Sequence, residues 1–270
     1  MAEAYNKDPA REWRRLVKDP YHSLEFLVTM HYIRKHFPPG GKVLDAGGGP
    51  GRYSIELCRA GYSVVLLDIS PGCIATAKNE FKSEPEAVQN RLSEFVVGNI
   101  RDLSRFETDH FDAVLCLGGA LAHIGHEADR ITAVSELVRV AKPGAVVCIS
   151  VVGYFAVLRT ILIQDSDELV DPSFQKLVNQ GDSCVGDMMW HFFRADELRN
   201  LAESCGLTTL EMAGCEGLSA GLAEATNLLA QDEAKWKRWE ELILETSAEP
   251  AVVHMAEHIL YLGQASKYQK

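Results

Sequence analysis

A glycine-rich turn is the segment of this sequence with the clearest chemical meaning. It reads Ala46-Gly47-Gly48-Gly49-Pro50-Gly51, and it connects an apolar segment at Val43-Leu44 to a stretch of helical character that begins at Arg52. Glycines let a ligand approach the backbone closely, and the free N–H groups at a helix start favour polar or anionic groups. Asp68 ends the next apolar segment, 21 positions after Gly47 (68 − 47). A carboxylate there can accept hydrogen bonds from both hydroxyls of a ribose, so the two features predict a nucleoside site.

The spacing of the glycines separates two classes of nucleoside cofactor. The dinucleotide fingerprint G-x-G-x-x-G fails in both registers, because Arg52 or Ser54 occupies the position of its last glycine. The glycines instead follow D-x-G-x-G-x-G, with Asp45 in the leading position. This register resembles the first motif of the class I S-adenosylmethionine-dependent methyltransferases, and Asp68 resembles the ribose-binding acid of that family.

Further motifs extend the resemblance over residues 41–152. Gly98-Asn99-Ile100-Arg101-Asp102-Leu103 follows the third apolar segment, Phe111–Leu117 is similar to the family's fourth strand, and Lys142-Pro143-Gly144 is similar to the turn before its fifth. Asn99 departs from the family, in which an aspartate is frequent, but an amide oxygen still accepts a hydrogen bond from an adenine amino group. The resemblance implies S-adenosylmethionine as the cofactor and S-adenosylhomocysteine as its product.

The resemblance also implies where each part of the cofactor lies, at the carboxyl ends of the strands. The expected cofactor-binding residues are Gly47, Gly49 and Gly51 at the methionine portion, Asp68 and Ile69 at the ribose, Asn99 and Ile100 at the adenine, Leu117 at the amino acid end, and Asp45 at the head of the motif.

Catalysis of methyl transfer requires a nucleophile aligned behind the methyl carbon and, for a protonated acceptor, a base. The candidate catalytic bases are His123, six residues past Leu117, and His191, which lies between Trp190 and Phe192. Each is also consistent with a packed or solvated histidine, and the sequence leaves both interpretations open.

Three residues are candidates for contact with the substrate. Tyr21 and His22 stand at the start of an N-terminal helix, where they could cover the site, and Trp190 belongs to an aromatic stretch suited to an organic acceptor. Ordinary helix and core packing is the alternative for all three. No metal is expected, because the fourth strand ends in Cys116-Leu117 instead of acidic ligands.

The elements that must position these residues alternate between apolar strands and helices. The predicted strands are 43–45, 63–68, 95–97, 111–117, 145–152, 207–212 and 259–262, and the predicted helices between them are 52–59, 71–81, 128–140 and 194–205. This alternation predicts an α/β fold with a parallel sheet covered by helices on both faces, and the family resemblance implies a doubly wound, mostly parallel seven-stranded sheet. The family resemblance implies that the last strand runs antiparallel.

Helical additions complete the predicted architecture of one domain over residues 1–270. Two short helices are expected to lead, with Asp19-Pro20 starting one of them, and residues 1–39 form an N-terminal helical cap. Residues 154–190 and 218–257 are expected to be helical insertions over the acceptor site.

Composition limits the classes of partner. The 270 residues carry a net charge of −11, which argues against nucleic acid, and no apolar stretch reaches the ~20 residues of a membrane span. Seven cysteines without a Cys-x-x-Cys pair suit a reducing cytoplasm, and residues 1–18 lack the apolar centre of a signal peptide. A small-molecule acceptor is therefore expected, whereas the oligomeric state is not indicated. A non-catalytic S-adenosylmethionine-binding module and an NAD(P)-dependent oxidoreductase are the alternative functions.

Overall fold

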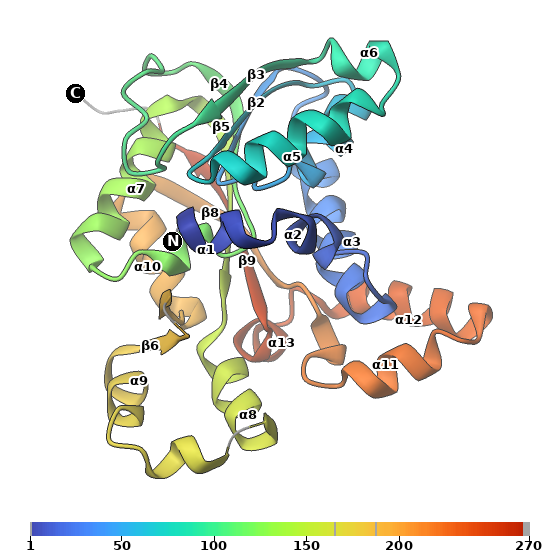
Figure 1. The fold of residues 1–270 in the computed structure, drawn as a ribbon, viewed down its shortest axis with the longest axis vertical. Helices are drawn as coiled ribbons and strands as arrows, with labels where there is room; N and C mark the ends of the chain where they lie inside the picture. Colours follow the sequence, from blue (N-terminus) through green and yellow to red (C-terminus); the bar gives the residue numbers. More distant parts are fainter. Residues whose placement is uncertain (1, 165, 187, 267–270) are drawn as a thin grey trace.

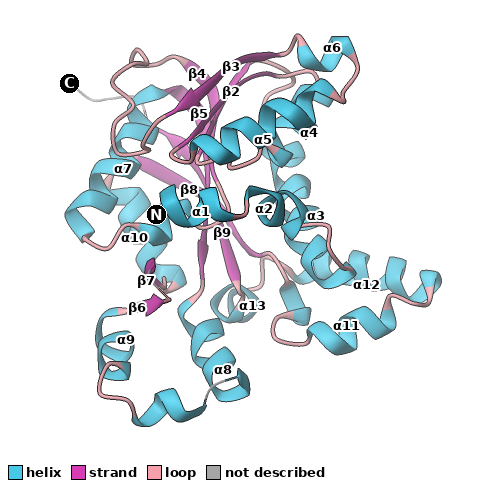
Figure 2. Ribbon diagram, viewed as in Figure 1, coloured by secondary structure: helices cyan, strands magenta, loops and turns pink. Residues whose placement is uncertain are grey.

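A seven-stranded sheet forms the centre of the computed structural model, which describes residues 2–164, 166–186 and 188–266. Its strands are β1 (Lys42–Ala46), β2 (Ser63–Asp68), β3 (Leu92–Val97), β4 (Phe111–Cys116), β5 (Ala141–Val152), β8 (Leu207–Gly214) and β9 (His258–Ala265). They are arranged in the order β3-β2-β1-β4-β5-β9-β8 (Figure 2). The first five pair in parallel, and β9 lies between β5 and β8, antiparallel to both. This arrangement confirms the predicted fold class and the antiparallel last strand.

The element bounds follow the sequence pattern closely at the functional end of the sheet. Strand β2 and helix α4 (Arg52–Arg59) have the predicted bounds. Strand β5 begins four residues earlier than predicted, at Ala141 instead of Ala145. Ala141 pairs with Phe111 across a register shift in the β4–β5 ladder, an irregularity that a hydrophobic pattern does not encode.

Helices cover both faces of the sheet. Residues adjacent along each strand point to opposite faces, and Val43 and Leu44 of β1 are both fully buried in different parts of the core. One face is covered by α3 (Pro20–His36), α4, α5 (Pro71–Lys82) and α6 (Glu86–Gln89), and the other by α7 (Glu127–Val140) and α10 (Ala195–Ser204) (Figure 1). The sheet is therefore buried on both sides, as its continuous apolar strands require.

Three helices precede the sheet where two were expected. They are α1 (Ala2–Lys7), α2 (Pro9–Arg15) and α3, and Figure 1 shows α1 and α2 lying across the front of the strands. Asp19 caps α3 as predicted, since its side chain accepts a hydrogen bond from the His22 N–H. The segment Asp8-Pro9 starts α2 in the same way, because the Asp8 side chain accepts from the N–H of Arg11.

The two insertions differ in structure. Residues 154–190 contain α8 (Tyr154–Gln164), the 3₁₀ helix η2 (Ser166–Val170), α9 (Phe174–Gln180) and the unexpected strands β6 (Asp182–Val185) and β7 (Met188–His191), which pair with each other. Residues 218–257 are helical as predicted, with η3 (Gly217–Ser219), α11 (Ala223–Leu229), α12 (Glu233–Thr246) and α13 (Pro250–Met255). Within the described residues, every helix is too short or too polar to cross a bilayer.

Candidate active site

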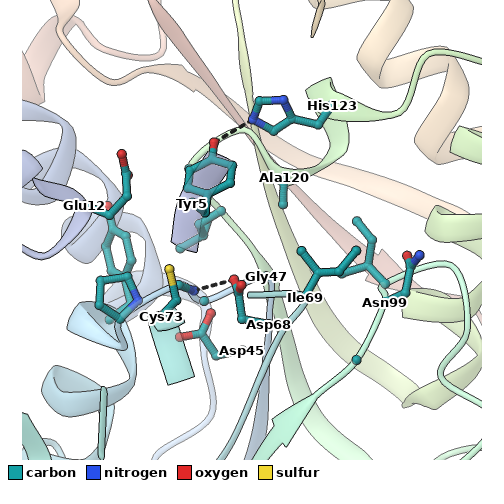
Figure 3. Close-up of a pocket in the computed structure, with 18 of the residues that line it drawn as sticks. Tyr5, Glu12, Asp45, Gly47, Asp68, Ile69, Cys73, Asn99, Ala120 and His123 are labelled. Atoms are coloured by element: carbon teal, nitrogen blue, oxygen red, sulfur yellow. Dashed lines mark hydrogen bonds between the residues drawn. The ribbon is translucent and has the colours of Figure 1, made fainter. Parts of the chain in front are cut away.

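A cavity of about 340 Å³ lies beside the carboxyl ends of β1, β2, β3 and β4 (Figure 3). Of the residues predicted to bind a cofactor or act as a base, those that line it are Asp45, Gly47, Gly49, Asp68, Ile69, Asn99, Ile100, Leu117 and His123. Segments from four different strand ends thus meet around one space, because parallel strands end at the same edge of the sheet. Gly51 does not line the cavity and instead precedes α4 with a left-handed φ of 86°.

The glycine loop is held tightly against β2. The N–H groups of Gly47 and Gly48 both donate to the carbonyl oxygen of Leu67, at 2.7 and 3.2 Å. A Cβ atom added to Gly48 would lie 2.4 Å from the Leu66 side chain, so only glycine fits there. A Cβ on Gly49 would meet no atom within 4 Å. The loop therefore combines one position that packing restricts to glycine with another that leaves its space open to a ligand.

Asp68 links the end of β2 to the glycine loop. Its Oδ2 accepts a hydrogen bond from the Gly49 N–H at 2.8 Å, and its Oδ1 accepts one from the Ser70 N–H at 2.7 Å. The side chain is largely buried, and burial raises the pKa of its carboxyl. Each carboxylate oxygen keeps one lone pair free for a further donor from the cavity.

Asp45, which lines the cavity, carries one unsatisfied carboxylate oxygen. Its Oδ2 accepts a hydrogen bond from the Ser54 hydroxyl at 2.7 Å, whereas its Oδ1 is buried without a hydrogen-bond partner among the described residues. Burial raises the pKa of Asp45 to about 6. A buried acceptor of this kind is costly unless a ligand supplies the missing donor.

The N-terminal helices close the cavity with residues that sequence reasoning missed. Tyr5, Glu12 and Arg15 line it from α1 and α2. Helix α1 is fixed to α5, because Asn6 Oδ1 accepts hydrogen bonds from the Ser70 hydroxyl at 2.7 Å and the Gly72 N–H at 2.8 Å. The sequence indicated these residues only through the predicted helical cap over residues 1–39, and no motif singled out any of them.

His123 lies in the cavity wall and faces Tyr5. Its Nε2 is 2.6 Å from the Tyr5 hydroxyl, and its Nδ1 is 3.4 Å from the carbonyl oxygen of Met189. Burial lowers the pKa of His123 to about 4. The imidazole is therefore neutral near pH 7, a state in which one ring nitrogen can accept a proton.

Trp190 and His191, the candidate residues at the end of the first insertion, do not line this cavity. Trp190 packs on His123, with 3.8 Å between the ring centroids. His191 is buried between two carboxylates, with Nδ1 2.7 Å from Asp182 and Nε2 2.6 Å from Glu197. These contacts tie the β6–β7 hairpin to α10, and that hairpin presents Trp190 to His123.

Tyr21 and His22 line a second cavity, of about 700 Å³, that shares Glu12 and Arg15 with the first. The Tyr21 hydroxyl donates a hydrogen bond to Oε1 of Glu257, and His22 Nδ1 is 2.7 Å from Asp19. The two predicted substrate residues are thus close to the cofactor cavity but separate from its lining.

A buried charge cluster forms part of the second cavity. Glu25, Glu216 and His258 have the spacing of metal ligands, and they are the one such group among the described residues. Arg15 binds Glu25 through two nitrogens at 2.5 and 3.1 Å, and His258 Nδ1 is 2.6 Å from Glu216. The two carboxylates raise the pKa of His258 to about 9 against the effect of burial. Two cations therefore already balance the two acids without a metal.

Residues 43–144 match the family model described as "Methyltransferase domain". The match covers the glycine loop, Asp68, Asn99 and the fourth strand, which together surround the cavity. Over this span the chain resembles the class I S-adenosylmethionine-dependent methyltransferase family. The cofactor of this family is S-adenosylmethionine.

The curated relatives of this chain are named for different acceptors. A glycine/sarcosine N-methyltransferase of Parasynechococcus marenigrum is 31% identical over 52% of this chain and 48% of its own length. A mitochondrial ubiquinone biosynthesis O-methyltransferase of Schizosaccharomyces pombe is 29% identical over 66% of this chain and 58% of its own. The chain thus spans about half the length of these curated relatives.

A solved structure supports the fold over nearly the whole chain. The S-adenosylmethionine-dependent methyltransferase of Methanosarcina mazei superposes with a TM-score of 0.63 at 20% identity, covering 88% of this chain and 98% of its own. At this identity the likeness concerns the fold.

The residues of the cavity fit the family's cofactor. The unpartnered Oδ1 of Asp45 lacks a donor, which an α-ammonium group supplies. The Arg15 guanidinium lines the same cavity, and a Cβ atom added to Gly118, just past β4, would lie 3.4 Å from its Nη2. The ammonium group of an amino acid end therefore finds a carboxylate in this wall, while Asp68 offers free lone pairs to a ribose.

Proposed function

We propose that this protein transfers a methyl group from S-adenosylmethionine to a small-molecule acceptor. The observation that carries the proposal is the unsatisfied Oδ1 of Asp45, a residue that lines a cavity together with the glycine loop and Asp68. A purely structural turn has no need of a buried carboxylate oxygen without a donor, because such an atom destabilises the fold.

The proposed binding mode assigns a partner to each end of the cofactor. Asp45 binds the α-ammonium group of the amino acid end, next to Leu117. Asp68 binds the ribose hydroxyls, and the side chains that follow β3 hold the adenine ring. The assigned adenine contacts are Asn99 and Ile100, with Ile69 beside the ribose.

The cofactor supplies an electrophilic methyl group on a sulfonium, and the protein's part is alignment and exclusion of water. Helix α1 covers the cavity through Tyr5, which excludes water from the reacting face. The backbone carbonyl of Met189 can only accept a hydrogen bond, so Nδ1 of His123 carries the proton and the unprotonated Nε2 accepts the hydrogen bond of the Tyr5 hydroxyl. We assign His123 as the base for acceptors that must lose a proton.

A small-molecule acceptor agrees with the relatives and with the charge of the chain. The names of the two relatives describe methylation of glycine or sarcosine and a step of ubiquinone biosynthesis. The net charge of −11 opposes binding to a nucleic acid backbone. The insertions at residues 154–190 and 218–257 flank the cavities, and we assign acceptor recognition to them and to the N-terminal cap.

Turnover of S-adenosylmethionine tests the proposal. The purified protein is incubated with a panel of small amines, phenols, thiols and carboxylic acids, and release of S-adenosylhomocysteine is measured. The account predicts release with at least one acceptor class and its loss in Asp68→Ala. Tight cofactor binding without release from any class would favour a binding module, and saturable NADH binding without cofactor binding would favour an oxidoreductase.

A further inference from the structure

The second cavity adjoins the cofactor cavity at α2. Glu12 and Arg15 line both spaces, and Arg15 reaches toward Gly118 at the end of β4, on the amino acid side of the cofactor cavity. A volume of about 700 Å³ is in the usual range for a small-molecule site. A ligand in this space would lie next to the cofactor with only side chains of α2 shared between them.

The carboxylates that line the second cavity already have ion-pair or hydrogen-bond partners within the protein. Glu25 is bound by Arg15, and Glu216 is bound by His258. Glu257 accepts hydrogen bonds from the Tyr21 hydroxyl and from the Gly221 N–H, the latter at 3.0 Å. Glu12 lies 3.4 Å from Nε of Arg15. The acidic side of the cavity therefore offers little unbalanced negative charge to a ligand.

Two arginines on the rim of the second cavity, unlike its carboxylates, lack partners of opposite charge among the described residues. Arg11 and Arg14 line the cavity, both are exposed, and neither forms an ion pair with any described residue. They are three positions apart on α2, so they share one face of the helix. Lys18 lines the same rim, next to Asp19, whose carboxylate His22 contacts. Two uncompensated guanidinium groups thus border a cavity in a chain of net charge −11.

We propose that the second cavity holds the carboxylate end of the methyl acceptor, a small organic anion bound there by Arg11 and Arg14, while the acceptor's reacting end extends past Glu12 and Arg15 into the cofactor cavity that His123 lines. The proposal rests on the proposed function for its neighbouring cofactor, and it goes further by naming the chemical class of the acceptor. Paired guanidinium groups bind carboxylates through charge-assisted hydrogen bonds, which are stronger than neutral ones. Tyr21 and His22 then contact the acceptor, in agreement with their prediction as substrate residues.

Ligand binding to the whole protein tests this assignment. The protein is saturated with S-adenosylhomocysteine and titrated, by ligand-observed NMR, with benzoate, 4-hydroxybenzoate, glycine and succinate and with the corresponding methyl esters or amides. Inorganic phosphate is a separate arm that distinguishes a carboxylate site from a general anion site. The double variant Arg11→Gln/Arg14→Gln is compared with Arg34→Gln, an exposed arginine of α3 outside both cavities. Neither substitution changes a residue that lines the cofactor cavity.

We expect at least one carboxylate to bind at least about tenfold more tightly than its methyl ester or amide. Its affinity should fall by a similar factor in the double variant and stay unchanged in Arg34→Gln. Affinity for S-adenosylhomocysteine stays within about twofold in all variants, because Arg11 and Arg14 do not line its cavity. Equal binding of acids and neutral partners, preference for phosphate, no binding of any probe, or full affinity in the double variant would each overturn the proposal. Failure of S-adenosylhomocysteine to bind the wild-type protein would instead refute the proposed function.

Discussion

The hydroxyl oxygen of Tyr5 lies 2.6 Å from Nε2 of His123, although 118 positions separate the two residues. This contact joins helix α1 to the segment after β4 across the cofactor cavity. Because Nδ1 of His123 faces the Met189 carbonyl oxygen, Nε2 is the nitrogen that accepts from the Tyr5 hydroxyl. Burial therefore holds His123 neutral, and its contact with Tyr5 closes the cavity.

Acid destabilises the protein through His123. The folded histidine binds a proton only near pH 4, whereas an unfolded one does so near pH 6.5, so the unfolded state gains protons first as the pH falls. Stability is lost between about pH 6.5 and 4, by at most about 3 kcal/mol from this residue. Urea unfolding at pH 7, 6, 5 and 4.5 should show a shallower loss in His123→Gln than in the wild type. The exposed His126→Gln is the control, and an unchanged slope in His123→Gln would refute the assignment.

Protonation of Asp45 should weaken cofactor binding. Burial raises its pKa to about 6, and only the carboxylate form attracts an ammonium group. Calorimetric titration with S-adenosylhomocysteine between pH 8 and 5 is compared for the wild type and Asp45→Asn. The wild type should bind more tightly at pH 8, and its advantage should shrink by up to about tenfold per pH unit below 6. A constant ratio across this range would mean that Asp45 does not bind the ammonium group.

Two neighbouring glycines should respond differently to alanine. In Gly48→Ala the new methyl group would clash with Leu66 and Asp45, which should lower the free energy of unfolding by about 1–3 kcal/mol. In Gly49→Ala nothing blocks the methyl group, and the φ of 55° costs about 1–2 kcal/mol. That methyl group enters the ligand space, so affinity for S-adenosylhomocysteine should fall at least about tenfold. Urea unfolding and calorimetry measure both effects, and normal cofactor affinity in Gly49→Ala would contradict the proposed cradle.

Local patterns were sufficient to predict the sheet and the cofactor side of the site. The bounds of β2 and α4 follow from an apolar run and from a glycine turn with a helix after it, and both are short-range signals. Asp68 was predicted because its position at the end of β2 has a fixed relation to the glycine loop. The structure places it within 2.8 Å of the Gly49 N–H.

The remaining parts of the site depend on long-range packing. Tyr5 and Arg15 carry no motif, and they reach the cavity only because α1 and α2 fold back over β4. The β6–β7 hairpin was read as helical, since its four-residue strands are too short to show a clear period. His191 was a candidate base from its sequence position, and its contacts with Asp182 and Glu197 became visible only in three dimensions.

Direct titration with S-adenosylhomocysteine tests the central claim, which is that the glycine loop and Asp68 bind the nucleoside of the cofactor. The wild type and Asp68→Ala are compared by calorimetry at pH 7.5, with the exposed Asp167→Ala of η2 as the charge-matched control and thermal unfolding as a check on folding. The account predicts saturable binding to the wild type and to Asp167→Ala, and affinity at least about tenfold weaker in folded Asp68→Ala. Absence of binding to the wild type, or undiminished affinity in Asp68→Ala, would contradict it.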